Sequence, residues 1–230
     1  MTSFTPTTDS IPALRVSNAY LFQSSGTEIV LIDSGLPGNA KRIADFMKSR
    51  DIEPKSLALI LLTHPDIDHS GSVWELKEKY CPNTRVAIHE VDAPRLSGEK
   101  KLKEMKGIQG FMMGAVSPFM KFHPVKPDIL LKDNEDIADL HVIHAPGHTL
   151  GSVCFYYKKE RSLFSGDTLI TDSNNNVVYS GKSMSYDLEM TKRSVQSKLK
   201  DLDLDMIFPG HGSAVASGAS EKIRMLCTQS

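Results

Sequence analysis

The sequence predicts a layered α/β domain in which helices cover β-sheets. Short β-prone runs alternate along the chain with segments whose apolar residues recur at helical spacing, and this alternation is typical of sheets covered by helices. The 230 residues suit one large domain, and no fixed-period repeat or Pro/Gly-rich linker divides them. We therefore expect a single domain over residues 19–230, preceded by a mobile N-terminal tail over residues 1–18.

The expected elements follow in chain order. Residues 19–23 and 28–32 are β-prone runs on either side of a Ser-Ser-Gly-Thr turn and predict a hairpin. Residues 38–50 carry apolar residues at helical spacing, and the continuously apolar run 57–62 predicts a strand buried on both faces. The remaining expected elements are a helix that ends before Pro82, strands at 85–88, 140–145, 153–157, 162–165 and 206–208, a helix over 188–202 and a last helix from about 219.

The net charge, the cysteines and the N-terminal pattern exclude several classes of partner and compartment. The formal net charge of −1 argues against nucleic acid and anionic membrane surfaces as partners, because their binders usually carry a basic excess. The three cysteines lie far apart, which is not a disulfide framework and fits a reducing compartment. With no signal-peptide pattern at the start and no apolar run long enough to span a bilayer, the sequence predicts a cytoplasmic globular protein.

Side chains that bind metals cluster directly after the buried strand. His64, Asp66, Asp68 and His69 lie within six residues. In an extended loop alternate residues point the same way, so His64, Asp66 and Asp68 are expected to converge while His69 faces a second metal. Imidazole and carboxylate together form the usual ligand set for zinc or non-haem iron.

Three further strands end in the same manner. His148 follows a Pro-Gly turn after one predicted strand, Asp167 follows Gly166 after the next, and His211 follows Pro-Gly after the last. Ligands at strand ends are held rigidly, and an adjacent glycine lets the backbone approach closely. Four strand ends thus each present a His or an Asp, a pattern that a solvated turn with helix caps does not explain.

The motifs H-x-D-x-D-H, P-G-H-T, G-D-T and P-G-H-G, in this order, resemble those of the metallo-β-lactamase fold superfamily. The resemblance runs from about Tyr20 to His211 and implies an αββα four-layer sandwich with a two-metal site at one edge of the sheets. It also implies that Asp33 supports the site from behind the ligands. The implied ligands are His64 and His148 for metal 1, Asp68, His69 and His211 for metal 2, and Asp167 as the bridge between them.

Asp66 departs from the family pattern, which usually has His at this position. With three carboxylates and a bridging hydroxide the charges of two divalent ions cancel, whereas a His would leave one positive charge. The extra carboxylate is expected to make a bound water less acidic and to favour harder metals such as iron or manganese over zinc. Flavodiiron proteins resemble this arrangement. Alternatively, Asp66 acts as a general base, or turns away and leaves metal 2 alone.

The leading hypothesis for function is a metal-dependent hydrolase, with two divalent ions, zinc foremost, that activate a water against an acyl carbon. Asp167, Asp66 and Asp68 are the candidate catalytic carboxylates, and the chain contains no G-x-S-x-G motif for a serine route. The motifs resemble the glyoxalase II-like and lactonase-like branch, but without its extra C-terminal domain, and Ile170 stands where lactonases carry Tyr. A small thioester, lactone or phosphoester is the expected substrate.

Two other functions compete with hydrolysis. Because of Asp66, an iron-dependent oxidoreductase related to flavodiiron or persulfide-oxidising members is one alternative, and the metal content of the purified protein would discriminate it. A non-enzymatic binding module on a decayed site is the other. It ranks last because the usual ligands, the bridging Asp167 included, are retained at every position except that of Asp66.

Residues 97–130 form an expected apolar insert. Within it, residues 107–125 contain several Met and Phe side chains interrupted by Gly and Pro, which suits either a lid over the substrate or a homodimer contact. The histidines outside the motifs match no ligand position: His89, His123, His141 and His144. His141 is expected to face solvent from a strand, and His89 is expected to cap a turn or to lie at the surface.

Overall fold

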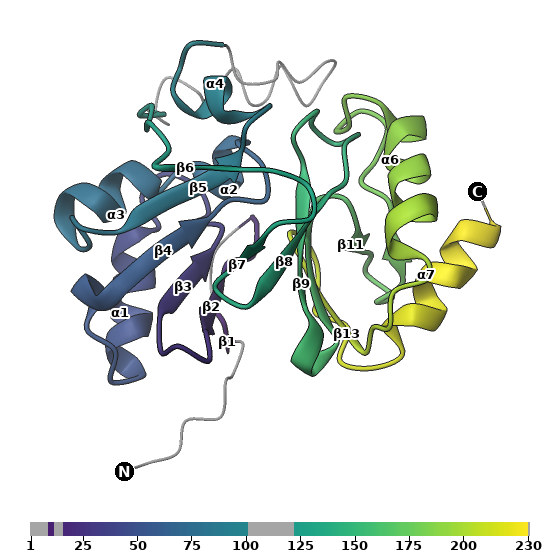
Figure 1. Ribbon diagram of the computed structural model, residues 1–230, viewed down its shortest axis with the longest axis horizontal. Coiled ribbons are helices and arrows are strands. Elements are labelled where there is room, and N and C mark those ends of the chain that lie inside the picture. The colour runs from purple at the N-terminus through teal and green to yellow at the C-terminus, as the bar shows by residue number, and fades with distance from the viewer. Residues whose placement is uncertain (1–8, 12–15, 101–121, 230) are drawn as a thin grey trace.

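The computed structural model of the chain describes residues 9–11, 16–100 and 122–229. Figure 1 shows two sheets packed face to face, with helices on the outer face of each. The predicted αββα four-layer sandwich is therefore confirmed.

The first sheet comes from the N-terminal half and is mostly parallel. Strands β1, β2 and β3 pair antiparallel, and β3, β4, β5 and β6 pair parallel. In spatial order the strands are β1 (Asp9–Ser10), β2 (Tyr20–Gln23), β3 (Ile29–Ile32), β4 (Leu57–Leu61), β5 (Arg85–His89) and β6 (Ile129–Leu131).

The second sheet comes from the C-terminal half and is mostly antiparallel, apart from the parallel pair β10 and β13. Its spatial order is β13 (Met206–Pro209), β10 (Ser162–Gly166), β9 (Val153–Tyr157), β8 (Leu140–His144) and β7 (Asp136–Ile137). A separate small hairpin joins β11 (Ile170–Thr171) to β12 (Val177–Val178).

Helices cover the two outer faces (Figure 1). On the first sheet lie α1 (Ala40–Ser49) and α3 (Val73–Lys79), and on the second lie α6 (Leu188–Ser194), a following π-turn (Val195–Leu199) and α7 (Ala219–Thr228). The shorter helices are α2 (Ile67–Ser70), α4 (Ala93–Leu96) and the 3₁₀ turns Pro54–Ser56 and Lys158–Glu160.

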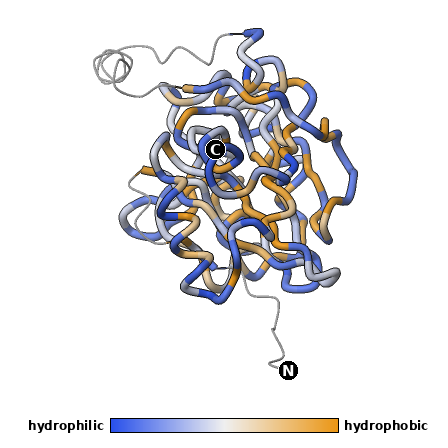
Figure 2. The backbone as a smooth tube through the Cα atoms, turned by 90° about the vertical axis from the view of Figure 1, so that its left-hand side faces the viewer, coloured by the Kyte–Doolittle hydropathy of each residue, from blue (hydrophilic) through white to orange (hydrophobic). Residues whose placement is uncertain are grey.

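Three apolar clusters hold the four layers together. One lies between α1, α3 and the first sheet, and another lies between the second sheet and its helices. The central cluster fills the space between the sheets and is rich in aromatic rings, among them Phe22, Phe155, Tyr157 and Phe164. Figure 2 shows the same division, with hydrophobic segments gathered inside and hydrophilic ones around them. Residues in β4 are buried on both faces of the sheet, as predicted from its continuous apolar run.

The long predicted elements are confirmed, and the shortest ones were missed. Strands β7, β11 and β12 have two residues each, too few to show an alternating pattern. The tail assignment is wrong for the described residues of 1–18. Asp9–Ser10 pairs with β2, and Asn18 donates its backbone N–H to Gly210 O at 2.7 Å. These residues therefore belong to the folded domain.

The insert predicted over 97–130 lies partly outside the described residues, and so does most of the segment 107–125 with its lid or dimer role. The C-terminal end of the predicted insert belongs to the first sheet, because β6 begins at Ile129 and pairs with β5. Among the described residues no helix is both long and apolar enough to cross a lipid bilayer.

Candidate metal centre

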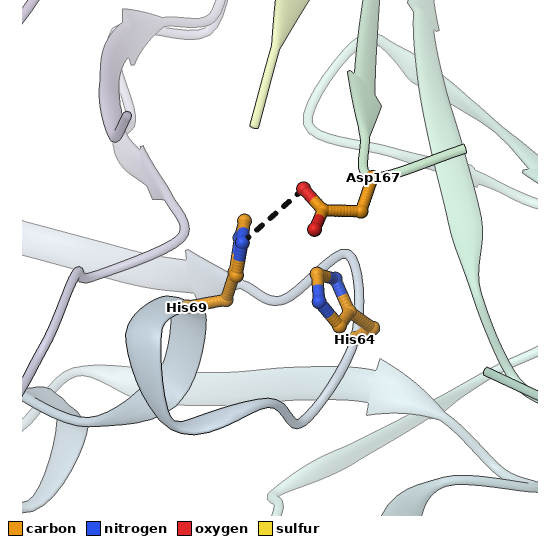
Figure 3. A group of neighbouring side chains, drawn as sticks. All are labelled: His64, His69 and Asp167. Atoms are coloured by element: carbon orange, nitrogen blue, oxygen red, sulfur yellow. Dashed lines mark ion pairs between the residues drawn. The ribbon is translucent and has the colours of Figure 1, made fainter. Parts of the chain in front are cut away.

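The candidate ligands meet where strands of both sheets end. His64 lies three residues beyond β4, His148 follows β8, Asp167 follows β10 directly, and His211 lies two residues beyond β13. Figure 3 shows how His64 and His69, from the first sheet's side, face Asp167 from the second. All seven candidate ligands named from the sequence are brought to this one edge.

The loop after β4 differs from the extended conformation that the sequence predicts. Helix α2 begins at Ile67, and the backbone N–H groups of His69 and Ser70 both donate to Asp66 O at 2.9 Å. This helical turn carries Asp68 away from His64 and Asp66. Asp68 therefore does not converge with those two residues, and instead it lies with His69 and His211.

Three overlapping groups of side chains could each hold a metal ion, and two of them have the same composition. The third, His64, His69 and Asp167, joins these two. We call His64, Asp66 and His148 the metal-1 subsite, and Asp68, His69 and His211 the metal-2 subsite. In the metal-1 subsite Asp66 Oδ2 lies 3.2 Å from His148 Nε2 and 3.8 Å from His64 Nε2. In the metal-2 subsite Asp68 Oδ2 lies 3.3 Å from His211 Nε2 and 3.8 Å from His69 Nε2.

Asp167 lies between the two subsites. Its Oδ1 is 3.3 Å from His69 Nε2, the contact that is dashed in Figure 3. Its Oδ2 is 3.2 Å from His211 Nε2 in the metal-2 subsite and 3.6 Å from His148 Nε2 in the metal-1 subsite. One carboxylate thus faces ligands of both groups, as the bridging role requires.

All four imidazoles are oriented in the same sense. The Nδ1 atoms of His64, His69, His148 and His211 face an oxygen outside the cluster. An Nδ1–H that donates to this oxygen leaves the Nε2 lone pair directed into the cluster, which is the arrangement found behind metal-binding histidines.

Asp33 sets two of these orientations from behind the ligands. Its Oδ2 accepts from His69 Nδ1 at 2.8 Å and from Thr63 Oγ1 at 2.8 Å. Because the Thr63 hydroxyl donates its proton to Asp33, it accepts from His64 Nδ1 at 2.9 Å. One buried carboxylate therefore orients a ligand of each subsite.

The residues present fit a pair of divalent cations. His64 Nε2 and Asp167 Oδ1 are buried and have no hydrogen-bond partner among the described residues, which is costly unless an ion takes that place. Ligands around a tetrahedral metal lie roughly 3.4 Å apart, close to the separations within each subsite. A Cβ on Gly210 would lie 2.2 Å from Asp167 Oδ1. Because glycine has no side chain, the space beside this carboxylate oxygen stays open.

Burial and neighbouring charges set the protonation states of the candidate ligands. Burial lowers the pKa of His64 to about 4, which keeps this ligand neutral. Burial also opposes the charge of Asp167, but the neighbouring His69 outweighs it and holds the pKa of Asp167 well below its usual value. For His211, burial is outweighed by hydrogen bonds to Asp167 and Asp68, which raise its pKa to about 10. A cation binding there displaces that proton.

The four other histidines join none of the candidate metal groups among the described residues. His89 stacks on His144 with ring centroids 4.0 Å apart, and His123 stacks on Trp74 at 4.1 Å. The expectation of surface exposure is wrong for His89, because it is only 4% exposed. Its Nδ1 accepts from the Val91 backbone N–H at 3.4 Å, as expected of a residue that caps the turn. Since His89 ends β5 directly before a turn, sequence alone does not reveal its burial.

Several groups that orient the ligands were missed at the sequence level. Ser180 Oγ lies 3.2 Å from His148 Nδ1, the Val16 carbonyl accepts from His211 Nδ1 at 2.9 Å, and Ser17 Oγ donates to the Asp68 carbonyl. Each lies more than thirty residues from its partner in a segment without periodic pattern. No local signal marks them.

The sequence was then compared with known proteins. The family model of the metallo-beta-lactamase superfamily matches residues 12–211. This chain belongs to that superfamily. The match includes every candidate ligand and every strand of the two sheets except β1, in agreement with the resemblance inferred from the motifs.

Curated relatives of this metallo-beta-lactamase chain include enzymes and proteins without an assigned activity. YobT of Bacillus subtilis, described as uncharacterized, is 35% identical over 156 residues, which are 68% of this chain and 63% of YobT. A hydroxyacylglutathione hydrolase of Pelagibacter ubique is 27% identical over 205 residues, 87% of this chain and 69% of that protein. The human acyl-coenzyme A thioesterase MBLAC2 is 28% identical over 176 residues, 68% of this chain and 60% of its own length. The chain thus spans less than two thirds of some of these relatives.

Solved structures support the fold. TTHA1623, crystallised in a di-iron-bound form, superposes with a TM-score of 0.68 at 24% identity, over 93% of this chain and 94% of that one. At this identity the likeness concerns the fold alone.

Proposed function

We propose that this protein is a hydrolase that uses a binuclear metal centre to cleave a small ester-type substrate. The observation that carries the proposal is the pair of matched ligand groups with Asp167 between them. Divalent cations held there supply a water nucleophile near neutral pH and polarise the acyl or phosphoryl oxygen that it attacks. Relatives named as a hydrolase and a thioesterase support the reaction class.

The carboxylates of the chain have separate tasks in this proposal. Asp167 orients the attacking water, because its two oxygens face the two subsites. Asp66 and Asp68 each give one subsite a negative charge, and their pKa values are lowered because the neighbouring imidazoles outweigh the cost of burial. All three are ionised at neutral pH and serve as ligands and proton acceptors rather than as acids.

A thioester, a lactone or a phosphoester remains the proposed substrate class. Zinc is the first metal proposed, and iron or manganese the alternative, since Asp66 adds a hard oxygen donor to the metal-1 subsite. The protein is proposed to act in the cytoplasm on a small molecule. A homodimer through the insert 97–130 remains a prediction.

A second function, iron-dependent oxidation, is favoured by one observation. Besides the shared Asp167, each subsite consists of two histidines and one carboxylate, a ligand set that would suit non-haem iron. The structural neighbour TTHA1623 is described in a di-iron form. An oxidoreductase built on this centre requires a separate electron donor, whereas the hydrolase requires only water.

One experiment separates these functions. The protein is purified without added metal, its metal content is measured, and portions reconstituted with zinc, iron or manganese are assayed on a thioester, a lactone and a phosphodiester. The hydrolase predicts turnover of one substrate class that is lost in the metal-free protein. If no class is hydrolysed while two ions are bound, the hydrolase proposal is wrong. Bound iron together with oxygen consumption would then favour the oxidoreductase.

A further inference from the structure

Beside the metal-1 subsite lies a buried carboxylate that is not among the candidate ligands. Asp92 is 0% exposed and directly precedes α4. Thr149 Oγ1 donates to Asp92 Oδ2, and the Gly151 backbone also hydrogen-bonds to this carboxylate. Both partners belong to the turn that carries His148. A group far away in the sequence thus holds the backbone of a candidate metal ligand.

The donor and the acceptor of each hydroxyl hydrogen bond in this turn can be assigned. Thr149 donates its backbone N–H to Ser152 Oγ at 2.9 Å, and the two hydroxyl oxygens lie 2.8 Å apart. Since the single Thr149 hydroxyl proton is donated to Asp92, the Ser152 hydroxyl must donate to Thr149. The chain from Ser152 through Thr149 to Asp92 therefore has one arrangement, which fixes the turn.

Packing enforces the same position. A Cβ on Gly151 would lie 2.7 Å from Asp92 Cγ, so the backbone of the turn rests directly against the carboxylate. On the other side of the ligand, Tyr186 donates its backbone N–H to the His148 carbonyl at 2.9 Å. The backbone around His148 is thus held from two sides, one of which is Asp92.

The charge of Asp92 is balanced inside the fold. Arg95 on α4 places its Nη1 3.7 Å from Asp92 Oδ1, and neither atom has a hydrogen-bond partner among the described residues. Burial raises the pKa of Asp92, and the hydrogen bond from Thr149 and the charge of Arg95 offset this only in part. A buried charged group of this kind is costly, which suggests a task beyond packing.

We propose that Asp92 is a positioning residue for metal 1: through Thr149 it fixes the turn of residues 145–152 and so holds His148 Nε2 in place beside Asp66. The inference rests on the metal centre proposed above. The metal-2 ligands Asp68, His69 and His211 lie outside this turn, so the effect concerns one subsite. Loss of a hydrogen bond behind a metal ligand commonly weakens metal binding by about 10–100-fold.

The test compares Thr149→Val, which removes the hydroxyl, with Thr149→Ser, which keeps it. Zinc affinity is measured calorimetrically in a His211→Ala background, where the metal-1 subsite remains, and in a His148→Ala background, where the metal-2 subsite remains. We expect Thr149→Val to weaken zinc binding about tenfold in the first background and to leave the second unchanged. Thr149→Ser should restore the first affinity.

Asp92→Asn is a second variant with the same readout, because its amide oxygen still accepts from Thr149 while the charge is lost. A smaller loss than in Thr149→Val is expected. Equal weakening in both backgrounds, or unchanged zinc affinity with only a lower melting temperature of the metal-free protein, would overturn the positioning role. If the parent protein binds no zinc, the metal centre itself is wrong, which is a different failure.

Discussion

The two subsites of the candidate metal centre have the same ligands but different supports. Each has two histidines and one aspartate. The metal-2 subsite is braced by the N-terminal segment, through Val16 and Ser17. The metal-1 subsite is braced by the later half of the chain, through Ser180, and by Asp92 through the turn of His148. The two subsites therefore match in their ligands but differ in the residues that orient those ligands.

Exposure separates the subsites further. In the metal-1 subsite the His64 and His148 side chains are each 1% exposed and that of Asp66 is 23% exposed. In the metal-2 subsite His69 is 0% exposed, whereas Asp68 and His211 are 21% and 19% exposed. The metal-2 subsite therefore has two partly exposed ligands and the metal-1 subsite has one. We infer that metal 2 exchanges more readily and that metal 1 depends more on the surrounding hydrogen bonds.

The largest expected effect comes from removing the residue that the two subsites share. Asp167→Ala should remove a ligand from both and lower both metal content and turnover. We expect an activity loss of about 10³-fold, since bound metals contribute several kcal/mol to transition-state stabilisation. Metal analysis and the substrate assay check this result. Asp201→Ala is the control, because it removes an exposed carboxylate outside the centre. An Asp167→Ala protein with two ions and normal turnover would contradict the bridging role.

A smaller effect is expected from making the subsites unequal in charge. Asp66→His turns the metal-1 subsite into three imidazoles, which should favour zinc over iron there. The loss of one negative charge should lower the pKa of the attacking water and shift the acidic limb of the pH–rate curve to lower pH. Competition between zinc and iron, together with the pH–rate curve, measures both effects.

Asp66→Asn serves as the matched control for that variant, because it removes the charge without adding an imidazole. It should move the pH limb in the same direction but should not raise the preference for zinc as Asp66→His does. If metal preference and pH profile both stay unchanged in Asp66→His, then Asp66 only caps the loop before α2.

The smallest effect concerns a histidine outside both subsites. Burial, followed by the nearby His144, lowers the pKa of His89 to about 4. Between pH 6.5 and 4 the unfolded chain binds a proton at this position that the folded chain does not, so stability falls as the pH falls through this window. From pH 7 to 5 the loss should be about 2 kcal/mol. Urea unfolding of metal-free parent and His89→Phe checks it, and equal pH slopes would contradict the assignment.

The convergence of the candidate ligands could be predicted from the sequence because each follows a strand with a clear pattern. The apolar run before His64 and the glycine beside Asp167, His148 and His211 mark these positions locally. The division between the subsites was only partly predictable, since the geometric argument assumed an extended loop. The four-residue helix α2 places Asp68 beside His69 and His211, the grouping that the family resemblance implies.

The supporting groups could not be predicted, for a physical reason. Asp92, Ser180 and Ser17 act through hydrogen bonds across 57, 32 and 51 residues of sequence, respectively. Such contacts depend on how the two sheets pack and leave no periodic trace in the chain. The short strands β7, β11 and β12 escaped prediction because two residues cannot show alternation.

Crystals of the reconstituted protein, with anomalous diffraction recorded at the absorption edge of the bound metal, test the central claim most directly. The account predicts two peaks, one bonded to His64, Asp66 and His148 and the other to Asp68, His69 and His211. Both peaks should lie within bonding distance of Asp167. A single peak, or a metal 1 from which Asp66 is turned away, would contradict the two matched subsites proposed for this protein.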